Sequence, residues 1–182
     1  MVRCNRGVLR EGASNVRAER VVEAADGSTE SQPKTFKRMP VATEAQFFNM
    51  RVPLLDQGRM DTEIARAGGM TARVKVYASG GENELHCHAG QDHMFVVLQG
   101  SARFYDRDEK TYDVTKHEGV MLPAGCYYWF NATSVEPLVM LRVDNATKPG
   151  DDRLGINGKA LPGNSIENKT VPVIVREGAF FE

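Results

Sequence analysis

Hydrophobic and polar side chains alternate along residues 72–78, where the apolar members are Ala72, Val74, Val76 and Ala78. Successive side chains of a strand point to opposite faces, so this period of two predicts a half-buried strand. The same pattern, with turn residues between the segments, predicts strands at 85–88, 93–99, 101–105, 112–115, 120–122, 127–131 and 138–143. Many short strands with almost no helical period predict an antiparallel β-sandwich or barrel.

The segments on either side of these strands follow other patterns. Residues 1–40 are rich in Arg, Glu, Gly and Ser without a sustained apolar period, which predicts a flexible N-terminal extension or an over-extended chain start. Thr43, followed by Glu44 and Gln46, is a weak start signal and predicts a short helix over 41–50. The run 171–175 (Val-Pro-Val-Ile-Val) predicts an edge strand. We expect it to cap the chain's own barrel; the alternative is that it adds a strand to a partner subunit.

Composition narrows the class of protein. A chain of 182 residues is long enough for one domain and does not require two. It has 23 basic and 24 acidic residues and a net charge of -1, which argues against nucleic-acid or anionic-membrane binding. No apolar run is long enough to span a membrane, the start lacks an apolar signal core, and three cysteines indicate a reducing compartment. We therefore expect a cytoplasmic protein with no nucleic-acid and no membrane partner.

Three of the four histidines lie close together, at His86, His88 and His93. His86 and His88 share one face of the predicted strand and lie roughly 6.5–7 Å apart along the backbone, so their imidazoles can converge on one metal ion. His93 begins the next predicted strand, and a third imidazole there completes a set that leaves positions for water or substrate. The spacing predicts a metal centre. The alternative is that His93 does not bind the metal, which leaves a site of two histidines or one completed by Asp92. Asp92 has the opposite parity, however, because His93, Phe95 and Val97 share one face.

These residues resemble the motifs of the cupin superfamily. Its first motif is a glycine, five residues, His-x-His, three or four residues, Glu, six residues and Gly; its second contains Pro-x-Gly, two residues and His. The positions that fit are Gly80, His86, His88, Gly100, Pro123 and Gly125. Two positions depart from the family: His93 stands at the glutamate and Tyr128 at the second-motif histidine. His117 and Asn131 do not complete the second motif either. The resemblance covers about residues 73–143 and implies an all-β cupin jelly roll, a double-stranded β-helix barrel.

The sequence pattern also predicts a domain organisation, and the resemblance implies a metal site. The barrel is expected over 41–145, and residues 146–182 are expected to be an extension that packs on the barrel or on a partner. Carried over by position, the metal ligands are His86, His88 and His93. Neutral imidazoles suit one divalent transition metal ion, iron first, with nickel, copper, manganese or zinc as alternatives. Tyr128 is predicted to act in catalysis as an acid, base or substrate-orienting donor; phenolate ligation and a core aromatic role are alternatives.

Several nearby residues have plainer interpretations. Glu84 shares the parity of His86 and either supports an imidazole or is solvated. His117 is predicted to be a surface histidine. Arg103 and Arg142 are expected to be exposed strand charges rather than anion ligands. Cys87 and Cys126 are expected to be small apolar residues. The apolar residues expected to exclude water from the site are Phe95, Val97, Trp129 and Phe130.

The leading functional hypothesis is a metal-dependent enzyme acting on a small organic molecule, with an Fe(II)-type dioxygenase as the first reaction. An enolisable diketone, a hydroxy ketone or an ortho-oxygenated aromatic fits the positions left by three imidazoles. One alternative is a non-redox metal-dependent isomerase, lyase or cyclase that stabilises an enolate. The other is a non-catalytic small-molecule-binding cupin. A homodimer is expected from the resemblance and the apolar C-terminal strand.

Overall fold

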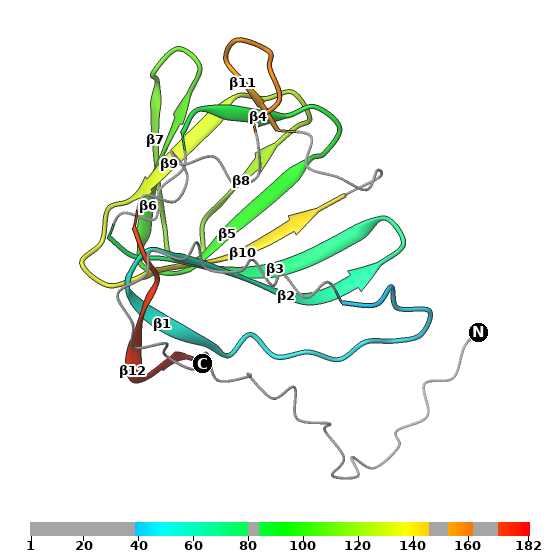
Figure 1. Ribbon diagram of the computed structural model, residues 1–182, viewed down its shortest axis with the longest axis vertical. Coiled ribbons are helices and arrows are strands. Elements are labelled where there is room, and N and C mark those ends of the chain that lie inside the picture. Colours follow the sequence, from blue (N-terminus) through cyan, green and yellow to red (C-terminus); the bar gives the residue numbers. More distant parts are fainter. Residues whose placement is uncertain (1–38, 80–83, 146–152, 162–170) are drawn as a thin grey trace, which may run out of the picture. The chain divides into compact units, whose positions relative to one another are not determined.

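The computed structural model describes residues 39–79, 84–145, 153–161 and 171–182. Regular structure in these residues consists of strands, and no helix among them has the length and apolarity to cross a membrane. The strands shown in Figure 1 are β1 (Val52–Gln57), β2 (Arg59–Ala67), β3 (Met70–Tyr77), β4 (His86–His88), β5 (His93–Gln99), β6 (Ser101–Asp106), β7 (Thr111–Thr115), β8 (Gly119–Leu122), β9 (Tyr128–Ala132), β10 (Leu138–Asp144), β11 (Arg153–Gly155) and β12 (Ile174–Phe181). The predicted extension over 1–40 lies almost entirely outside the described residues.

Two five-stranded sheets form the barrel. Their strand orders are β2-β3-β10-β5-β8 and β11-β4-β9-β6-β7, and their strands pair antiparallel. Side chains from both sheets meet in one buried cluster between them, which includes Tyr77, Phe95, Phe104, Phe130 and Met140. Alternation places one face of each strand inside, and aromatic rings from both sheets meet there. The predicted all-β jelly roll is confirmed.

A third sheet covers the outer face of the first one. It consists of β1 and β12, paired antiparallel, and Figure 1 shows it beside β2 and β3. Val52 and Leu55 of β1 pack with Val74, Val76 and Val139 in a second buried cluster. Because of this cover, the central strands β3 and β10 are buried on both faces. The C-terminal strand therefore pairs within its own chain, although it begins at Ile174, beyond most of the predicted run.

The two-sided burial reverses the expected orientation of β3. Period-two alternation suggested that Val74 and Val76 face the core and that Arg73 and Lys75 face solvent. In the structure Val74 and Val76 lie under β1 and β12, and Tyr77, on the same face as Lys75, belongs to the cluster inside the barrel. Lys75 itself is 9% exposed. A second apolar layer, which local sequence does not reveal, is the physical reason.

The predicted helix over 41–50 is wrong. Residues 39–51 have no regular structure and run along β2, where Ala42 N donates to Arg66 O at 2.8 Å. Arg66 N in turn donates to Gln46 Oε1 at 3.1 Å, and Met39 N to Glu63 Oε1 at 2.8 Å. The backbone of this segment therefore forms hydrogen bonds with β2 and not within a helix. The weak start signal at Thr43 was not enough to stabilise a helix.

The turn between β5 and β6 depends on Gly100. Its φ is 76°, in the left-handed region that favours glycine. A Cβ atom there would lie 2.5 Å from Ser134 Oγ and 3.2 Å from Leu138 Cα. The backbone of β10 therefore approaches this turn closely, and the position that the cupin resemblance marked as glycine is one that other residues would strain.

Candidate functional site

The structure brings the four predicted site residues together. His86 and His88 lie on β4, His93 begins β5 and Tyr128 begins β9, and all four side chains are buried. His86 and Tyr128 are direct cross-strand partners, with ring centroids 4.8 Å apart. The His86 and His88 rings are 5.2 Å apart, and the His88 and His93 rings are 4.0 Å apart. We call these four residues the histidine cluster.

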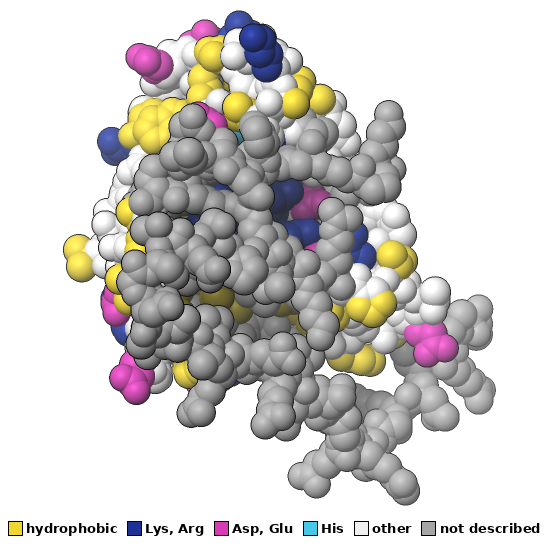
Figure 2. Space-filling model, viewed as in Figure 1, with side chains coloured by type: hydrophobic (Ala, Val, Ile, Leu, Met, Phe, Trp, Pro, Cys, Tyr) yellow, Lys and Arg dark blue, Asp and Glu magenta, His cyan; other side chains and the backbone are white. Residues whose placement is uncertain are grey.

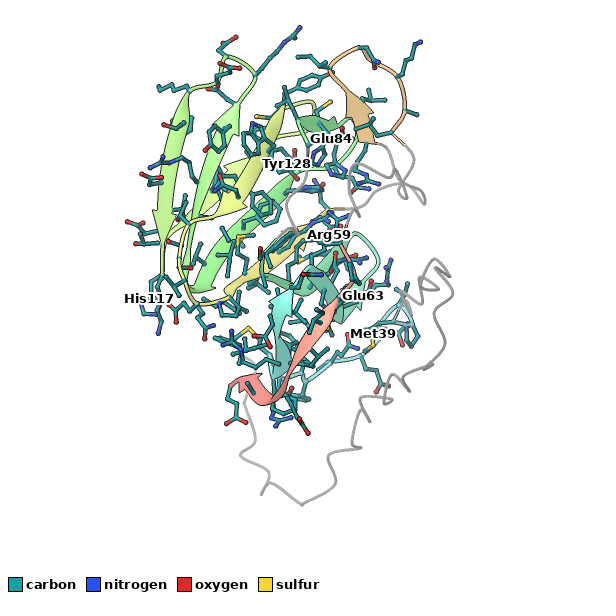
Figure 3. All side chains as sticks on the ribbon, turned by 60° about the vertical axis from the view of Figure 1, so that its left-hand side comes forward. Met39, Arg59, Glu63, Glu84, His117 and Tyr128 are labelled. Carbon is teal, nitrogen blue, oxygen red and sulfur yellow. The ribbon has the colours of Figure 1, made fainter. Side chains whose placement is uncertain are left out.

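A backbone carbonyl fixes the tautomer of His86. Its Nδ1 lies 2.7 Å from the carbonyl oxygen of Glu84. A carbonyl oxygen only accepts, so Nδ1 carries the proton, and in the neutral ring Nε2 holds the lone pair. Figure 3 shows Glu84 and Tyr128 at the same end of the barrel. Glu84 therefore supports the imidazole through its backbone, whereas its buried side-chain Oε1 has no hydrogen-bond partner within residues 39–79, 84–145, 153–161 and 171–182.

Both ring nitrogens of His93 are engaged. Nε2 lies 2.9 Å from Arg142 Nη2, and Nδ1 lies 3.2 Å from the hydroxyl of Tyr128. A guanidinium only donates, so Nε2 accepts and Nδ1 carries the proton, which it donates to the Tyr128 oxygen. The oxygen of Gln91 lies farther from Nε2, at 3.3 Å, so Arg142 decides the tautomer. The hydroxyl proton of Tyr128 must then point away from His93.

Burial and positive charge set the protonation of this pair. Burial lowers the pKa of His93 far below its ordinary value, and the charges of Arg142 and Lys75 lower it further. Burial raises the pKa of Tyr128 well above its ordinary value, although Arg142 and Arg153 act in the opposite direction. His93 is therefore neutral and Tyr128 protonated near neutral pH. This agrees with the prediction that Tyr128 acts as a protonated donor; its catalytic role stays a prediction.

A network of ion pairs borders the histidine cluster on the side of β2, β3 and β10. Lys75 pairs with Asp61 at 2.6 Å, Arg73 with Glu63 at 2.7 Å, and Arg142 with Asp144 at 3.3 Å. Figure 2 shows basic and acidic side chains gathered near the centre of the face in view. This network was not predicted, because the half-buried strand expected over 72–78 was recognised only by its apolar face, which includes Val74 and Val76.

Arg142 is the main correction to the site. We expected an exposed strand charge, but its side chain is only 15% exposed and contacts His93. Its face of β10 also carries Leu138 and Met140, which belong to the cluster inside the barrel. The alternation of Leu138, Met140 and Arg142 on one face of the strand could have indicated that Arg142 points inward. It was ambiguous because the other face is equally apolar, with Val139, Leu141 and Val143.

The donor set does not fit an ion held by all three imidazoles in this arrangement. Among the described residues, no group of three or more His, Cys, Asp or Glu side chains is placed to hold a metal ion. His93 Nε2 already accepts from Arg142, whose positive charge opposes a nearby cation. Ligation by His86, His88 and His93 stays a prediction, and it requires Arg142 to leave His93 first.

Comparison with known proteins identifies the family. Residues 73–144 match the family model described as the cupin domain. Residues 73–144 are therefore a cupin domain. The match begins in β3 and ends with β10, and it contains the whole histidine cluster. No curated protein matches the chain.

Solved structures similar to this cupin include three that illustrate the range. An uncharacterised protein with a double-stranded β-helix domain from Klebsiella pneumoniae is 14% identical, with 51% of this chain and 81% of that chain covered and a TM-score of 0.46. A cupin superfamily protein from Desulfitobacterium hafniense is 18% identical, covering 50% and 81%, with a TM-score of 0.44. An oxalate oxidase in complex with glycolate is 20% identical, covering 52% and 54%, with a TM-score of 0.44.

The structure agrees with some of the remaining sequence predictions for this cupin and contradicts one of them. Phe95, Val97 and Phe130 lie in the apolar cluster below the histidines, as predicted. The prediction for Trp129 is wrong: it lies on the opposite face of β9 and stacks on Tyr105, with ring centroids 3.9 Å apart. Cys87 is buried, as expected. Cys126 is partly buried, and burial raises the pKa of its thiol, which opposes a nucleophilic role.

Three polar residues lie apart from the histidine cluster, as expected. His117 is exposed in the turn before β8, and Figure 3 shows it far from Tyr128. Arg103 pairs with Asp113 on a largely exposed face. Asp92 accepts from Ala124 N at 2.8 Å and from Asn145 Nδ2 at 2.6 Å, so its carboxylate ties two loops together.

Proposed function

We propose that this cupin is an enzyme that stabilises an enolate of a small carbonyl compound at the histidine cluster, as an isomerase, lyase or cyclase does. The observation that supports this is the hydrogen-bonded chain from Arg142 through His93 to Tyr128. Because the Tyr128 oxygen accepts from His93, its own proton is directed elsewhere and serves as a donor to a substrate oxygen. A fixed donor in a buried site stabilises negative charge as it develops on that oxygen.

His86 is the base that this proposal assigns. The carbonyl of Glu84 holds the proton of the neutral ring on Nδ1, so Nε2 is the ring nitrogen that can accept a proton. Its ring is 4.8 Å from that of Tyr128. In the proposed step, Nε2 takes the proton from the carbon beside the carbonyl. The C–H electron pair forms the enolate C=C bond, and the carbonyl oxygen becomes an oxyanion that accepts from Tyr128.

The apolar floor of the barrel supports the same chemistry. Phe95 packs against Tyr128 and His93, with ring centroids 6.0 and 6.1 Å apart, and Phe130 packs against Phe95 at 5.8 Å. These rings keep water away from the lower side of the cluster. A hydrogen bond to an oxyanion is stronger where water is excluded.

Proton exchange tests the proposal directly. Acetylacetone and hydroxyacetone, incubated without oxygen in D2O, are expected to lose their α-proton NMR signals faster with the wild-type protein than in buffer. The His86→Ala variant is expected to lose the acceleration, because it lacks the base, and the His117→Ala variant to retain it. Acceleration that survives in His86→Ala would contradict the proposal. Binding of these compounds without any exchange would favour a non-catalytic binding protein.

A metal-dependent dioxygenase, with iron as the first ion, is the second candidate. The His86 tautomer favours it, because Nε2 is then the coordinating nitrogen and His88 lies beside it. A bound divalent ion would supply Lewis acidity or redox chemistry. For His93 to join, its Nε2 has to be released from Arg142. Oxygen consumption that depends on added iron and on a chelating substrate would favour this candidate over the first.

Arg142→Met provides a test of the metal site that does not require turnover. Removing the guanidinium frees His93 Nε2 and removes an opposing charge. Hydrogen bonds to charged groups contribute about 1.5–3 kcal/mol, so Co²⁺ affinity is expected to rise about tenfold or more. Visible absorption of the bound Co²⁺ and competition with a chelator measure it. Arg103→Met is the matched control. Equal Co²⁺ affinity in wild type and Arg142→Met would argue against a site that includes His93.

A further inference from the structure

Arg142 has a buried donor that nothing in the described chain satisfies. Its Nη2 donates to His93 Nε2 at 2.9 Å and lies 3.3 Å from Asp144 Oδ2. Its Nε is buried and has no hydrogen-bond partner among the described residues. Buried N–H groups of a guanidinium are destabilising unless an acceptor reaches them. Arg142 Nε therefore lacks an acceptor among the described residues.

Arg73 repeats this feature on the neighbouring strand. β3 and β10 pair so that Arg73 and Arg142 are direct cross-strand partners. Arg73 Nη2 donates to Glu63 at 2.7 Å. Its buried Nε has no hydrogen-bond partner in the part of the chain that the structure describes and lies 4.0 Å from Asp144 Oδ2. Two paired guanidinium groups thus each carry an unsatisfied Nε inside the barrel.

The charge around these groups favours an anion. Within the described residues, the ion-pair network contains four cations (Arg66, Arg73, Lys75 and Arg142) and three anions (Asp61, Glu63 and Asp144), so the cations exceed the anions by one. Asp61 is engaged by Lys75, and Glu63 by Arg66 and Arg73. Asp144 faces both guanidinium groups without forming a hydrogen bond to either through Oδ2. The acidic side chains of this network therefore do not supply an acceptor for Arg142 Nε.

We propose that Arg142, supported by Arg73, is the receptor for a carboxylate group, and that the substrate of this cupin is a small organic acid. The inference rests on the proposed function and names its substrate class. The carboxylate accepts from Arg142 Nε, a contact that a guanidinium makes with a planar oxyanion. Since Arg142 contacts His93 and His93 contacts Tyr128, a short acid held at Arg142 extends toward the Tyr128 hydroxyl. Asp144 is the internal group with which the ligand competes.

Calorimetric titration of the full chain with malonate, and with its neutral analogue malonamide, tests the receptor. Malonate is expected to bind the wild type, and malonamide to bind at least about tenfold more weakly, because charge-assisted hydrogen bonds are the stronger ones. Arg142→Gln is expected to weaken malonate binding by about tenfold or more and to leave malonamide unchanged. Arg103→Gln, an arginine on the exposed face of β6, is the matched control and is expected to bind malonate as the wild type does.

The result that overturns the proposal is equal malonate binding by wild type and Arg142→Gln, or equal binding of malonate and malonamide by the wild type. Arg142→Lys keeps a charge and lacks Nε, so it is expected to bind malonate at an intermediate level; it carries the test if Arg142→Gln does not fold by circular dichroism. Malonate binding without proton exchange on any ketone or keto acid upholds the receptor and overturns the enolate function. Proton exchange on acetylacetone without malonate binding upholds the enolate function and overturns the carboxylate receptor.

Discussion

Replacing Tyr128 by phenylalanine is expected to lower the rate of enzyme-dependent α-proton exchange by about 10²–10³-fold, because removing one preorganised donor to an oxyanion has this effect in other enzymes. The ring stays and only the hydroxyl is lost, so packing against Phe95 and His86 is retained. Exchange rates in D2O, measured by NMR at saturating ketone, provide the number. The loss should appear in the maximal rate, because the donor acts on charge that develops in the transition state.

Tyr112→Phe is the matched control for this experiment. Tyr112 lies on β7, is 45% exposed and donates to Asp106 at the surface. The Tyr112→Phe variant is expected to exchange ketone protons at the wild-type rate. A Tyr128→Phe variant with unchanged exchange would remove the phenol from the mechanism and restore its interpretation as a core aromatic. The thermal stability of both variants, measured alongside, separates a folding defect from a lost donor.

Asp61→Asn is expected to lower the free energy of unfolding by about 3 kcal/mol, because breaking a buried pair leaves the charge of Lys75 without its partner. Asp61 and Lys75 are direct cross-strand partners and pair at 2.6 Å, with side chains 15% and 11% exposed. Urea denaturation at neutral pH measures the loss. Asp113→Asn breaks the same kind of cross-strand pair with Arg103, but there the side chains are 60% and 43% exposed. It is expected to leave the midpoint nearly unchanged.

The effect of Asp61→Asn should depend on pH in a definite direction. Burial raises the pKa of Asp61, but Lys75, Arg142 and Arg73 together lower it more, so its folded-state pKa lies below the usual value. Such a carboxylate stabilises the fold above its unfolded pKa, and that contribution is lost as the pH falls through the folded pKa. The wild type should therefore lose its advantage over the variant in acid. A difference that grows toward low pH would contradict this assignment.

Strand positions were well predicted where strong turn signals bound a short segment. β5 was expected at 93–99 and is His93–Gln99. Gly100, with its left-handed backbone, ends this strand whatever surrounds it. β1 and β2 were missed, because Pro53 weakens the first as a strand signal and Asp61 and Glu63 interrupt the apolar pattern of the second. The acidic residues of β2 are tolerated only because Lys75 and Arg73 lie opposite them on β3.

The histidine cluster was largely predictable, and its neighbour was not. The parity of His86 and His88, with His93 one short loop away at the start of β5, requires only local strand geometry. Whether Arg142 faces the barrel depends on which side of β10 is inside, and both of its sides are apolar. Cys87, between the two histidines, is buried on the opposite side of β4, so even there alternation alone did not separate an inside from an outside.

By resemblance to the cupin motifs the sequence indicated Tyr128, and by itself it determined that this protein is built from short antiparallel strands and that three imidazoles belong to one cluster. It did so because side-chain alternation and turn residues act within a few positions of the chain. Only the tertiary structure decided that Arg73, Lys75 and Arg142 lie inside the barrel and that Arg142 takes the nitrogen of His93. The physical reason is the sheet of β1 and β12, which buries the outer faces of β3 and β10 and directs their charged faces inward.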